Sequence, residues 1–265
     1  MTDVSEKVRE TCLSYIGRAR QVDDSMAPEQ AGRLAMVLGS KMPDGLPPTW
    51  HWAYFTTVIP AEQVGHDGHE KLGLFMPPAP FARRMWAAGE ITVNRPLKLG
   101  VPASRVSTIA DVAFKTGKTG PLCFVQVRHE ITQAGALALS ELQTIVYRDR
   151  GLAERALRGP DDPVPDGYRV FPDTQLLAYS GVIQNTHRIH WDRDFCRDVE
   201  GYPGLVVHGP LLATTLADAL MPPSGMGPCR FTYRAKAPVF ETSPVRVIAE
   251  DGSARIERSD GVVAM

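Results

Sequence analysis

Three consecutive runs between residues 103 and 148 alternate apolar and polar side chains, and they constrain the fold more than any other stretch. The runs cover 103–115, 122–133 and 138–148, and short glycine-containing turns connect them. Alternation with a period of two is typical of strands with one buried face. Short connections of this kind join antiparallel neighbours. We therefore predict an antiparallel meander within an α+β fold class.

The second half of the chain repeats this outline. Residues 28–38 and 210–220 predict apolar helices with a proline near the first turn. Strand-like runs follow the second helix at 228–236, 244–250 and 254–258. A charged segment rich in proline and glycine, 149–167, divides the halves. We predict an N-terminal unit at 1–150 and a C-terminal unit at 165–265, each with an antiparallel sheet wrapped around a central helix. This arrangement is a tandem, or double, hot-dog fold.

Three other segments have local patterns of their own. Residues 2–20 repeat apolar side chains at helical spacing, which predicts one long helix. Residues 51–59 are aromatic and β-branched, which favours a strand or a buried extended segment. Residues 81–90 follow a proline cluster, so we expect them in a structured binding loop, with a strand at 90–96.

The composition excludes several classes of function. A net charge of −1 argues against a nucleic-acid partner. The four cysteines are far apart and form no zinc-ribbon pair. The N-terminus lacks the apolar core of a signal peptide, and no apolar run is long enough to span a membrane. A cytoplasmic protein without a membrane partner is expected.

The segment 180–192, SGVIQNTHRIHWD, concentrates polar chemistry beside an apolar run. Asn185 and His190 are five residues apart, and His208 and Gly209 stand at the entrance of the predicted helix 210–220. A histidine can accept and return a proton near neutral pH. A backbone amide at a helix N-terminus can hold negative charge on an oxygen. Together they predict an acid/base site around one carbonyl group.

These residues resemble the MaoC-like hydratases and dehydratases, whose signature has the form S-G-D-x-N-P-x-H-x-D, followed by H-G at the helix opening. In this alignment the catalytic Asp of the family falls on Asn185 and its catalytic His on His190. His187 and Arg188 replace the usual Asn-Pro, and Gly209 takes the place of the oxyanion donor.

Longer runs are similar to the double hot-dog subfamily of itaconyl-CoA hydratases and mesaconyl-C4-CoA hydratases. The resemblance covers roughly residues 30–240 and includes FMPPAPFARRMWAAGEI, NTHRIHWD and GYPGLVVHGPLLATTLADAL. It implies an acyl-CoA thioester substrate, water addition that gives citramalyl-CoA, and no cofactor. The N-terminal unit would then supply much of the acyl-CoA cleft and the C-terminal unit the chemistry.

The resemblance also implies roles for individual residues. We expect His190 to be the principal acid/base, the Gly209 amide to hold the enolate oxygen, and Asn185 to orient the water. Because an amide exchanges no proton at neutral pH, His190 carries both proton steps or a neighbour, His187 or Asp192, takes one. The expected substrate-binding residues are Arg83, Arg84 and Trp86 for CoA, Arg188 for a free carboxylate, and His187 and His208 beside the reacting atoms.

Other interpretations of the same residues stay open. An isolated HxxH is more often structural than functional, and no Asp, Glu or Cys ligands at known spacing accompany it, so no metal is expected. His51, His66, His69 and His129 have no partner in the sequence and are expected to be structural. The rival functions are a fatty-acid-type 3-hydroxyacyl-thioester dehydratase, a thioesterase and a non-catalytic acyl-thioester-binding protein. A homodimer would be natural for this fold.

Overall fold

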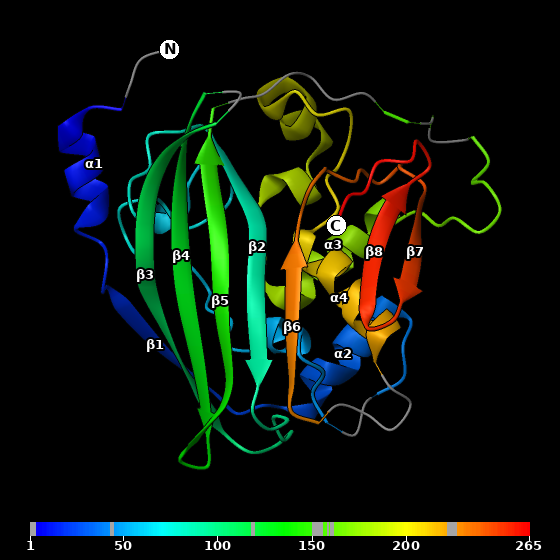
Figure 1. Ribbon diagram of the computed structural model, residues 1–265, viewed down its shortest axis with the longest axis horizontal. Helices are drawn as coiled ribbons and strands as arrows, with labels where there is room; N and C mark the ends of the chain where they lie inside the picture. Colours follow the sequence, from blue (N-terminus) through cyan, green and yellow to red (C-terminus); the bar gives the residue numbers. More distant parts are fainter. Residues whose placement is uncertain are drawn as a thin grey trace.

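The computed structural model describes residues 4–42, 45–117, 120–149, 156–157, 159, 162–221 and 227–265. Antiparallel strands make up one long sheet with the order β1-β3-β4-β5-β2-β6, and β7 and β8 pair separately (Figure 1). The strands are β1 (Ala19–Asp24), β2 (Arg83–Val93), β3 (Ala103–Gly117), β4 (Gly120–Gln133), β5 (Ala136–Arg148), β6 (Cys229–Arg234), β7 (Val245–Glu250) and β8 (Ser253–Arg258).

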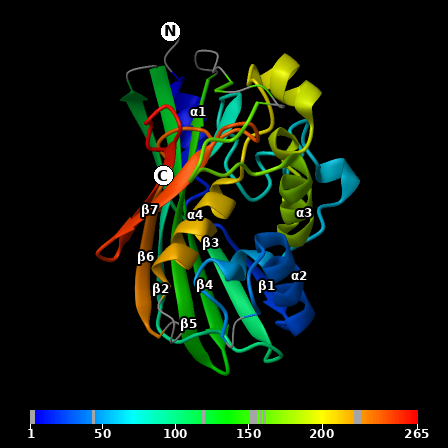
Figure 2. The ribbon, with the colours of Figure 1, turned by 90° about the vertical axis from the view of Figure 1, so that its right-hand side faces the viewer.

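The α-helices are α1 (Glu6–Leu13), α2 (Pro28–Leu38), α3 (Asp173–Ile183) and α4 (Gly209–Leu220). Figure 2 shows α2, α3 and α4 together on one side of the long sheet. Shorter 3-10 turns are Trp50–Ala53, Ala61–Gln63 and Arg188–His190, and a π-helix covers Phe195–Glu200. No helix within the described ranges is long and apolar enough to cross a membrane.

The predicted meander is confirmed, since β3, β4 and β5 pair with their neighbours along nearly their whole length. Alternate residues of β4, Cys123, Val125 and Val127, are buried. Helices α2 and α4 are confirmed as well. In α4, Pro210 stands in the first turn and a continuous set of apolar residues is buried, including Leu211, Leu212 and Leu216.

Two local predictions are wrong. The helix predicted over 2–20 ends at Leu13, and Gly17 adopts a φ of 87° that turns the chain into the edge strand β1. Residues 51–59, expected to form a strand or a buried extended segment, form a 3-10 turn followed by an irregular segment. Phe55 there has a left-handed φ of 55°, which a strand does not allow. The aromatic side chains of this segment fill the core instead, with Trp50, Tyr54 and Phe55 nearly inaccessible.

The loop predicted for 81–90 is also wrong, because Arg83–Val93 forms the strand β2. This strand lies between β5 and β6, with Trp86 opposite Ile145 and Gly89 opposite Tyr233. Since β6 comes from the C-terminal half, the long sheet continues across the predicted boundary between the units. The two-unit division stays a prediction, and most of residues 150–161 of the expected linker lie outside the described residues.

Glu141 on β5 connects residues from the two halves of the chain through hydrogen bonds inside the core. Its carboxylate is 2% exposed and accepts from His51 Nε2 at 2.9 Å, Trp52 Nε1 at 3.0 Å and the Tyr233 hydroxyl at 2.8 Å. Burial alone would raise the pKa of Glu141, but the hydrogen bond and charge of His51 and the other donors outweigh it and lower the pKa to about 2.

We expect Glu141→Gln to lower the free energy of unfolding at pH 7 by about 2 kcal/mol or more, because buried donors lose a charged acceptor. A depressed pKa stabilises the fold above the carboxyl's ordinary value of 4.5, and the stabilisation is lost as the pH falls toward about 2. Urea unfolding should therefore show a large difference between wild type and variant at pH 7 and a smaller one at pH 3. Equal differences at both pH values would contradict this. Glu130→Gln, an exposed control on β4, should change little.

Candidate active site

His190 lies at the centre of the site, at the end of the 3-10 turn that follows α3. Its ring is 6% exposed, and its Nδ1–H donates to the carbonyl of Val206 at 2.7 Å. Because a carbonyl only accepts, Nε2 carries the lone pair. Burial lowers the pKa of His190 to about 3, so the imidazole is neutral at pH 7. The residue therefore presents a neutral base with a defined tautomer.

His208 supports this ring from one side. The two imidazoles stack with centroids 3.7 Å apart and planes 18° apart. His208 is fully buried, its Nε2 is 2.8 Å from the Ser180 hydroxyl, and burial holds its pKa well below the ordinary value. No polar atom of the described residues bonds to its Nδ1. The stack restricts the His190 ring to one orientation.

Asn185 stands where α3 ends and the chain reverses. Gln184 adopts a left-handed φ of 50°, and the Asn185 amide donates back to the Ser180 carbonyl at 2.9 Å. The side-chain Oδ1 of Asn185 accepts from the backbone N–H of His187 at 3.0 Å. The carbonyl of this side chain thus closes the turn that directs His187 into the site.

Gly209 begins α4, and its amide has no intrahelical acceptor. A Cβ at this position would overlap Cε3 of Trp86 on β2. The Trp86 ring in turn stacks on Tyr233, with centroids 4.2 Å apart and an interplanar angle of 11°. Glycine is therefore required for the end of the helix to approach the sheet. Trp86, expected to stack on CoA, lies against this helix end.

The three predicted arginines are in different environments. Arg83 is buried and bonds to Glu200 Oε2 at 3.0 Å, with Tyr202 beneath its guanidinium. Arg188 bonds to Asp192 Oδ2 at 2.7 Å and to the His66 carbonyl at 3.1 Å. Protein carboxylates thus hold both guanidinium groups.

The guanidinium group of Arg84 has no hydrogen-bond or ion-pair partner among the residues that the structure describes. Arg84 is half-buried. Burial lowers the pKa values of His69 and His187, and the positive charge of Arg84 lowers them further. Arg84 shares a small hollow of the surface with Asp67, Ala82, Arg83, His187, Ile189, Glu200 and Tyr202.

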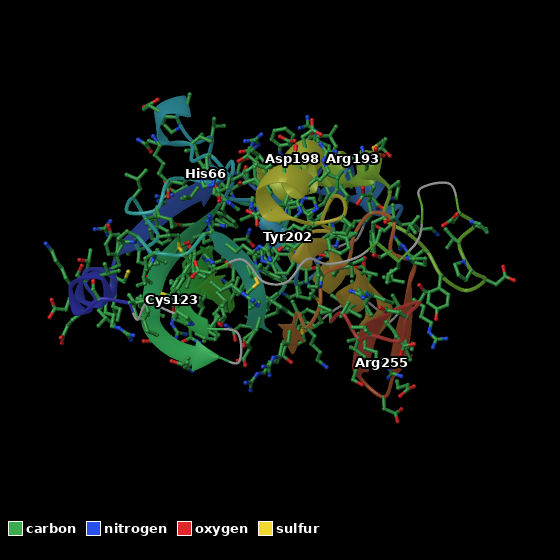
Figure 3. The ribbon with its side chains drawn as sticks, turned by 90° about the horizontal axis from the view of Figure 1, so that it is seen from above. His66, Cys123, Arg193, Asp198, Tyr202 and Arg255 are labelled. Carbon is green, nitrogen blue, oxygen red and sulfur yellow. The ribbon has the colours of Figure 1, made fainter. Side chains whose placement is uncertain are left out.

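A loop from the N-terminal half completes the site, and the sequence interpretation missed it. Gly68 has a φ of 91°, and a Cβ there would overlap the Thr186 carbonyl, so the loop lies directly on the histidine motif. Figure 3 shows His66 of this loop close to the segment that carries Asp198 and Tyr202. The local signal is the sequence Asp-Gly-His, in which a tight turn brings both flanking side chains to one side.

This loop places Asp67 and His69 beside His187. Asp67 Oδ2 accepts from His69 Nδ1 at 3.1 Å, and the rings of His69 and His187 are 4.2 Å apart. The ligand atoms of the three residues lie within 4.8 Å of one another, so among the described residues these three could hold a metal ion. The expected absence of a metal and of a cofactor stays a prediction.

The chain is similar to known proteins along most of its length. The family model described as hydroxyacyl-thioester dehydratase type 2 matches residues 49–241. A mesaconyl-C(4)-CoA hydratase of Chloroflexus aurantiacus is 39% identical, over 96% of this chain and 95% of the relative.

Two solved structures show the fold. A MaoC-like dehydratase aligns with a TM-score of 0.65 at 15% identity, over 95% of this chain and 96% of that chain. A Mycobacterium tuberculosis protein described as having a double hot-dog fold aligns with a TM-score of 0.54 at 11% identity, over 94% and 93% of the two chains. The predicted double hot-dog fold of the α+β class is confirmed.

Proposed function

Because the chain belongs to the hydroxyacyl-thioester dehydratase type 2 family, we propose that it adds water to mesaconyl-C4-CoA, or to itaconyl-CoA, and forms citramalyl-CoA. The observation that carries this proposal is the similarity to a mesaconyl-C(4)-CoA hydratase along nearly the whole of both chains. The site geometry supports the same chemistry, since a neutral buried imidazole lies near a helix N-terminus.

The reaction follows from these groups. With mesaconyl-C4-CoA, Nε2 of His190 accepts one proton from water, and the water oxygen bonds to the β-carbon of the conjugated thioester. The π electrons move toward the thioester oxygen, where the Gly209 amide and the α4 dipole stabilise the enolate. One such donor contributes about 3 kcal/mol to lowering the barrier. The imidazolium then returns its proton to the α-carbon. Asn185 supports the site by holding the turn of His187.

A free carboxylate distinguishes the proposed substrate from a simple enoyl-CoA. In mesaconyl-C4-CoA this group is attached to the β-carbon, where water adds, so it should lie on the side of His190 away from the thioester. The ring of His187 is perpendicular to that of His190, with centroids 5.5 Å apart, and His187 and Arg84 line the same hollow. We assign the carboxylate to Arg84, because Asp192 already neutralises Arg188.

The test mixes the protein with mesaconyl-C4-CoA, itaconyl-CoA and crotonyl-CoA and identifies the products by mass. Loss of enoyl-thioester absorbance follows the mesaconyl and crotonyl substrates. The itaconyl double bond is not conjugated with the thioester, so its hydration is followed by the mass of the product alone. Wild type should prefer the dicarboxylic substrates. Arg84→Met should reduce the ratio of kcat/KM for mesaconyl-C4-CoA over crotonyl-CoA by about 10²-fold, since a charged hydrogen-bonding pair is lost. Arg188→Met is the matched control and should leave the ratio within about threefold. An unchanged ratio in Arg84→Met would remove the carboxylate assignment.

The other functions have different outcomes in the same assay. A wild-type preference for crotonyl-CoA would favour a fatty-acid-type dehydratase. Release of free thiol would favour a thioesterase, and saturable binding without turnover would favour a binding protein. The cytoplasmic location and the homodimer stay predictions, as do the CoA contacts of Arg83 and Trp86.

A further inference from the structure

The site lacks the carboxylate that the family signature places after α3. Asn185 occupies that position, its Oδ1 is bound to the His187 N–H, and an amide has no proton to exchange at neutral pH. An attacking water has two O–H groups, of which one gives its proton to His190. The other becomes the hydroxyl of the product and needs an acceptor while it is buried. This acceptor has to come from elsewhere in the chain.

His187 has the position and the free capacity for this task. Its ring is 7% exposed, and no hydrogen-bond partner for it is found in the described part of the chain. The ring is perpendicular to that of His190, with centroids 5.5 Å apart. Burial, followed by the charges of His69 and His190, keeps the pKa of His187 well below its ordinary value, so the ring is neutral and retains one lone pair. His187 lines the surface hollow that Arg84 also lines, so a ligand that enters the hollow can bond to this ring.

Asp67 and His69 support His187 from the loop. Asp67 accepts from both the backbone N–H and Nδ1 of His69, each at 3.1 Å, which leaves the His69 lone pair on Nε2. Burial alone would raise the pKa of Asp67, but the hydrogen bonds that it accepts from His69 hold it well below the usual range. Asp67 is therefore an anion at neutral pH, beside a row of neutral imidazoles.

We propose that Asp67, His69 and His187, here called the loop triad, form the second water-binding group of the site. The inference rests on the proposed hydratase function. His187 accepts the O–H that the product retains, and His69 holds the His187 ring in place. The Asp67 carboxylate orients this pair, since the polar atoms of the three residues lie within 4.8 Å of one another.

The protons balance in this scheme. Water gives one proton to His190 Nε2, the oxygen–β-carbon bond forms as the π bond breaks, and His190 returns the proton to the α-carbon. The loop triad ends each cycle unchanged. The triad thus supplies a hydrogen-bond acceptor for the water, whereas Asn185 Oδ1 is already bound to the His187 N–H.

The experiment uses the full chain with mesaconyl-C4-CoA and crotonyl-CoA as substrates. Asp67→Asn retains an acceptor for the His69 backbone N–H and removes the charge, and Asp67→Ala leaves room for formate. We expect each variant to lose about 10²-fold or more in kcat with KM changed by less than about fivefold. Formate should restore Asp67→Ala at least about tenfold, an effect that a merely structural role would not produce.

Glu70→Ala is the matched control. Glu70 belongs to the same loop but pairs with Arg20 at 2.7 Å, so its variant should retain wild-type kcat within about threefold and not respond to formate. The proposal is overturned if Asp67→Asn keeps more than a third of the wild-type kcat, or if formate fails to restore Asp67→Ala. It is also overturned if the protein holds one equivalent of metal whose removal by a chelator abolishes activity. Failure of wild type to hydrate any enoyl-CoA would instead reject the proposed function.

Discussion

His190→Gln is expected to lower kcat for enoyl-CoA hydration by about 10³-fold or more, the largest effect of any substitution considered. Glutamine cannot accept a proton from water at neutral pH, and general acid–base catalysis contributes about 10²–10⁴-fold. In the proposed mechanism the same ring both accepts and returns the proton. Initial rates under saturating mesaconyl-C4-CoA measure the loss, and thermal unfolding establishes that the variant is folded.

His66→Gln is the control for this substitution. His66 is exposed on the loop beside the site, and its backbone carbonyl, not its ring, binds Arg188. Its variant should keep at least half of the wild-type kcat. If His190→Gln retained more than a tenth of the activity, another residue would have to be the base, and the assignment of the neutral buried imidazole would be wrong.

Gly209→Ala is expected to lower kcat by about 10²-fold or more and to destabilise the fold by about 1–3 kcal/mol. The new methyl group would overlap Cε3 of Trp86, which Tyr233 holds from its other face. Either the indole or the first turn of α4 must move, and the Gly209 amide, which we propose holds the enolate oxygen, moves with it. Urea unfolding and steady-state kinetics measure the two effects.

Gly181→Ala offers a comparison at another helical glycine. Gly181 is exposed in α3, and nothing lies within 4 Å of an added Cβ, so alanine should leave activity unchanged and slightly stabilise the helix. A Gly209→Ala enzyme with wild-type kcat would show that this amide contributes no stabilisation to the transition state.

Local periodicity predicted much of the sheet and two of the helices. The alternation over 103–148 gives β3, β4 and β5 because each strand has one buried face and its partner is a hairpin neighbour. The apolar run after Gly209 gives α4 for a similar reason, with Pro210 suited to its first turn. These elements depend on residues close together in the chain.

Distant contacts decided the elements that local patterns missed. The strand β2 begins at Arg83, within an expected loop, because β5 and β6 provide hydrogen-bond partners on both sides. The aromatic residues of 51–59 resemble a strand, yet their packing into the core and the left-handed Phe55 override this preference. Partners tens to more than a hundred residues away cannot be inferred from local periodicity.

The same division holds for the site. The sequence alone determined the double hot-dog fold class and brought His190, Asn185 and Gly209 to attention, since a short motif carries both identity and spacing. Only the tertiary structure decided that burial keeps His190 neutral. It also decided that Arg188 forms an ion pair with Asp192, while the guanidinium of Arg84 has no partner among the described residues. Finally, it brought Asp67 and His69 close to His187. Charge state and pairing depend on desolvation and on groups brought together by folding, and neither is a property of neighbouring residues in the chain.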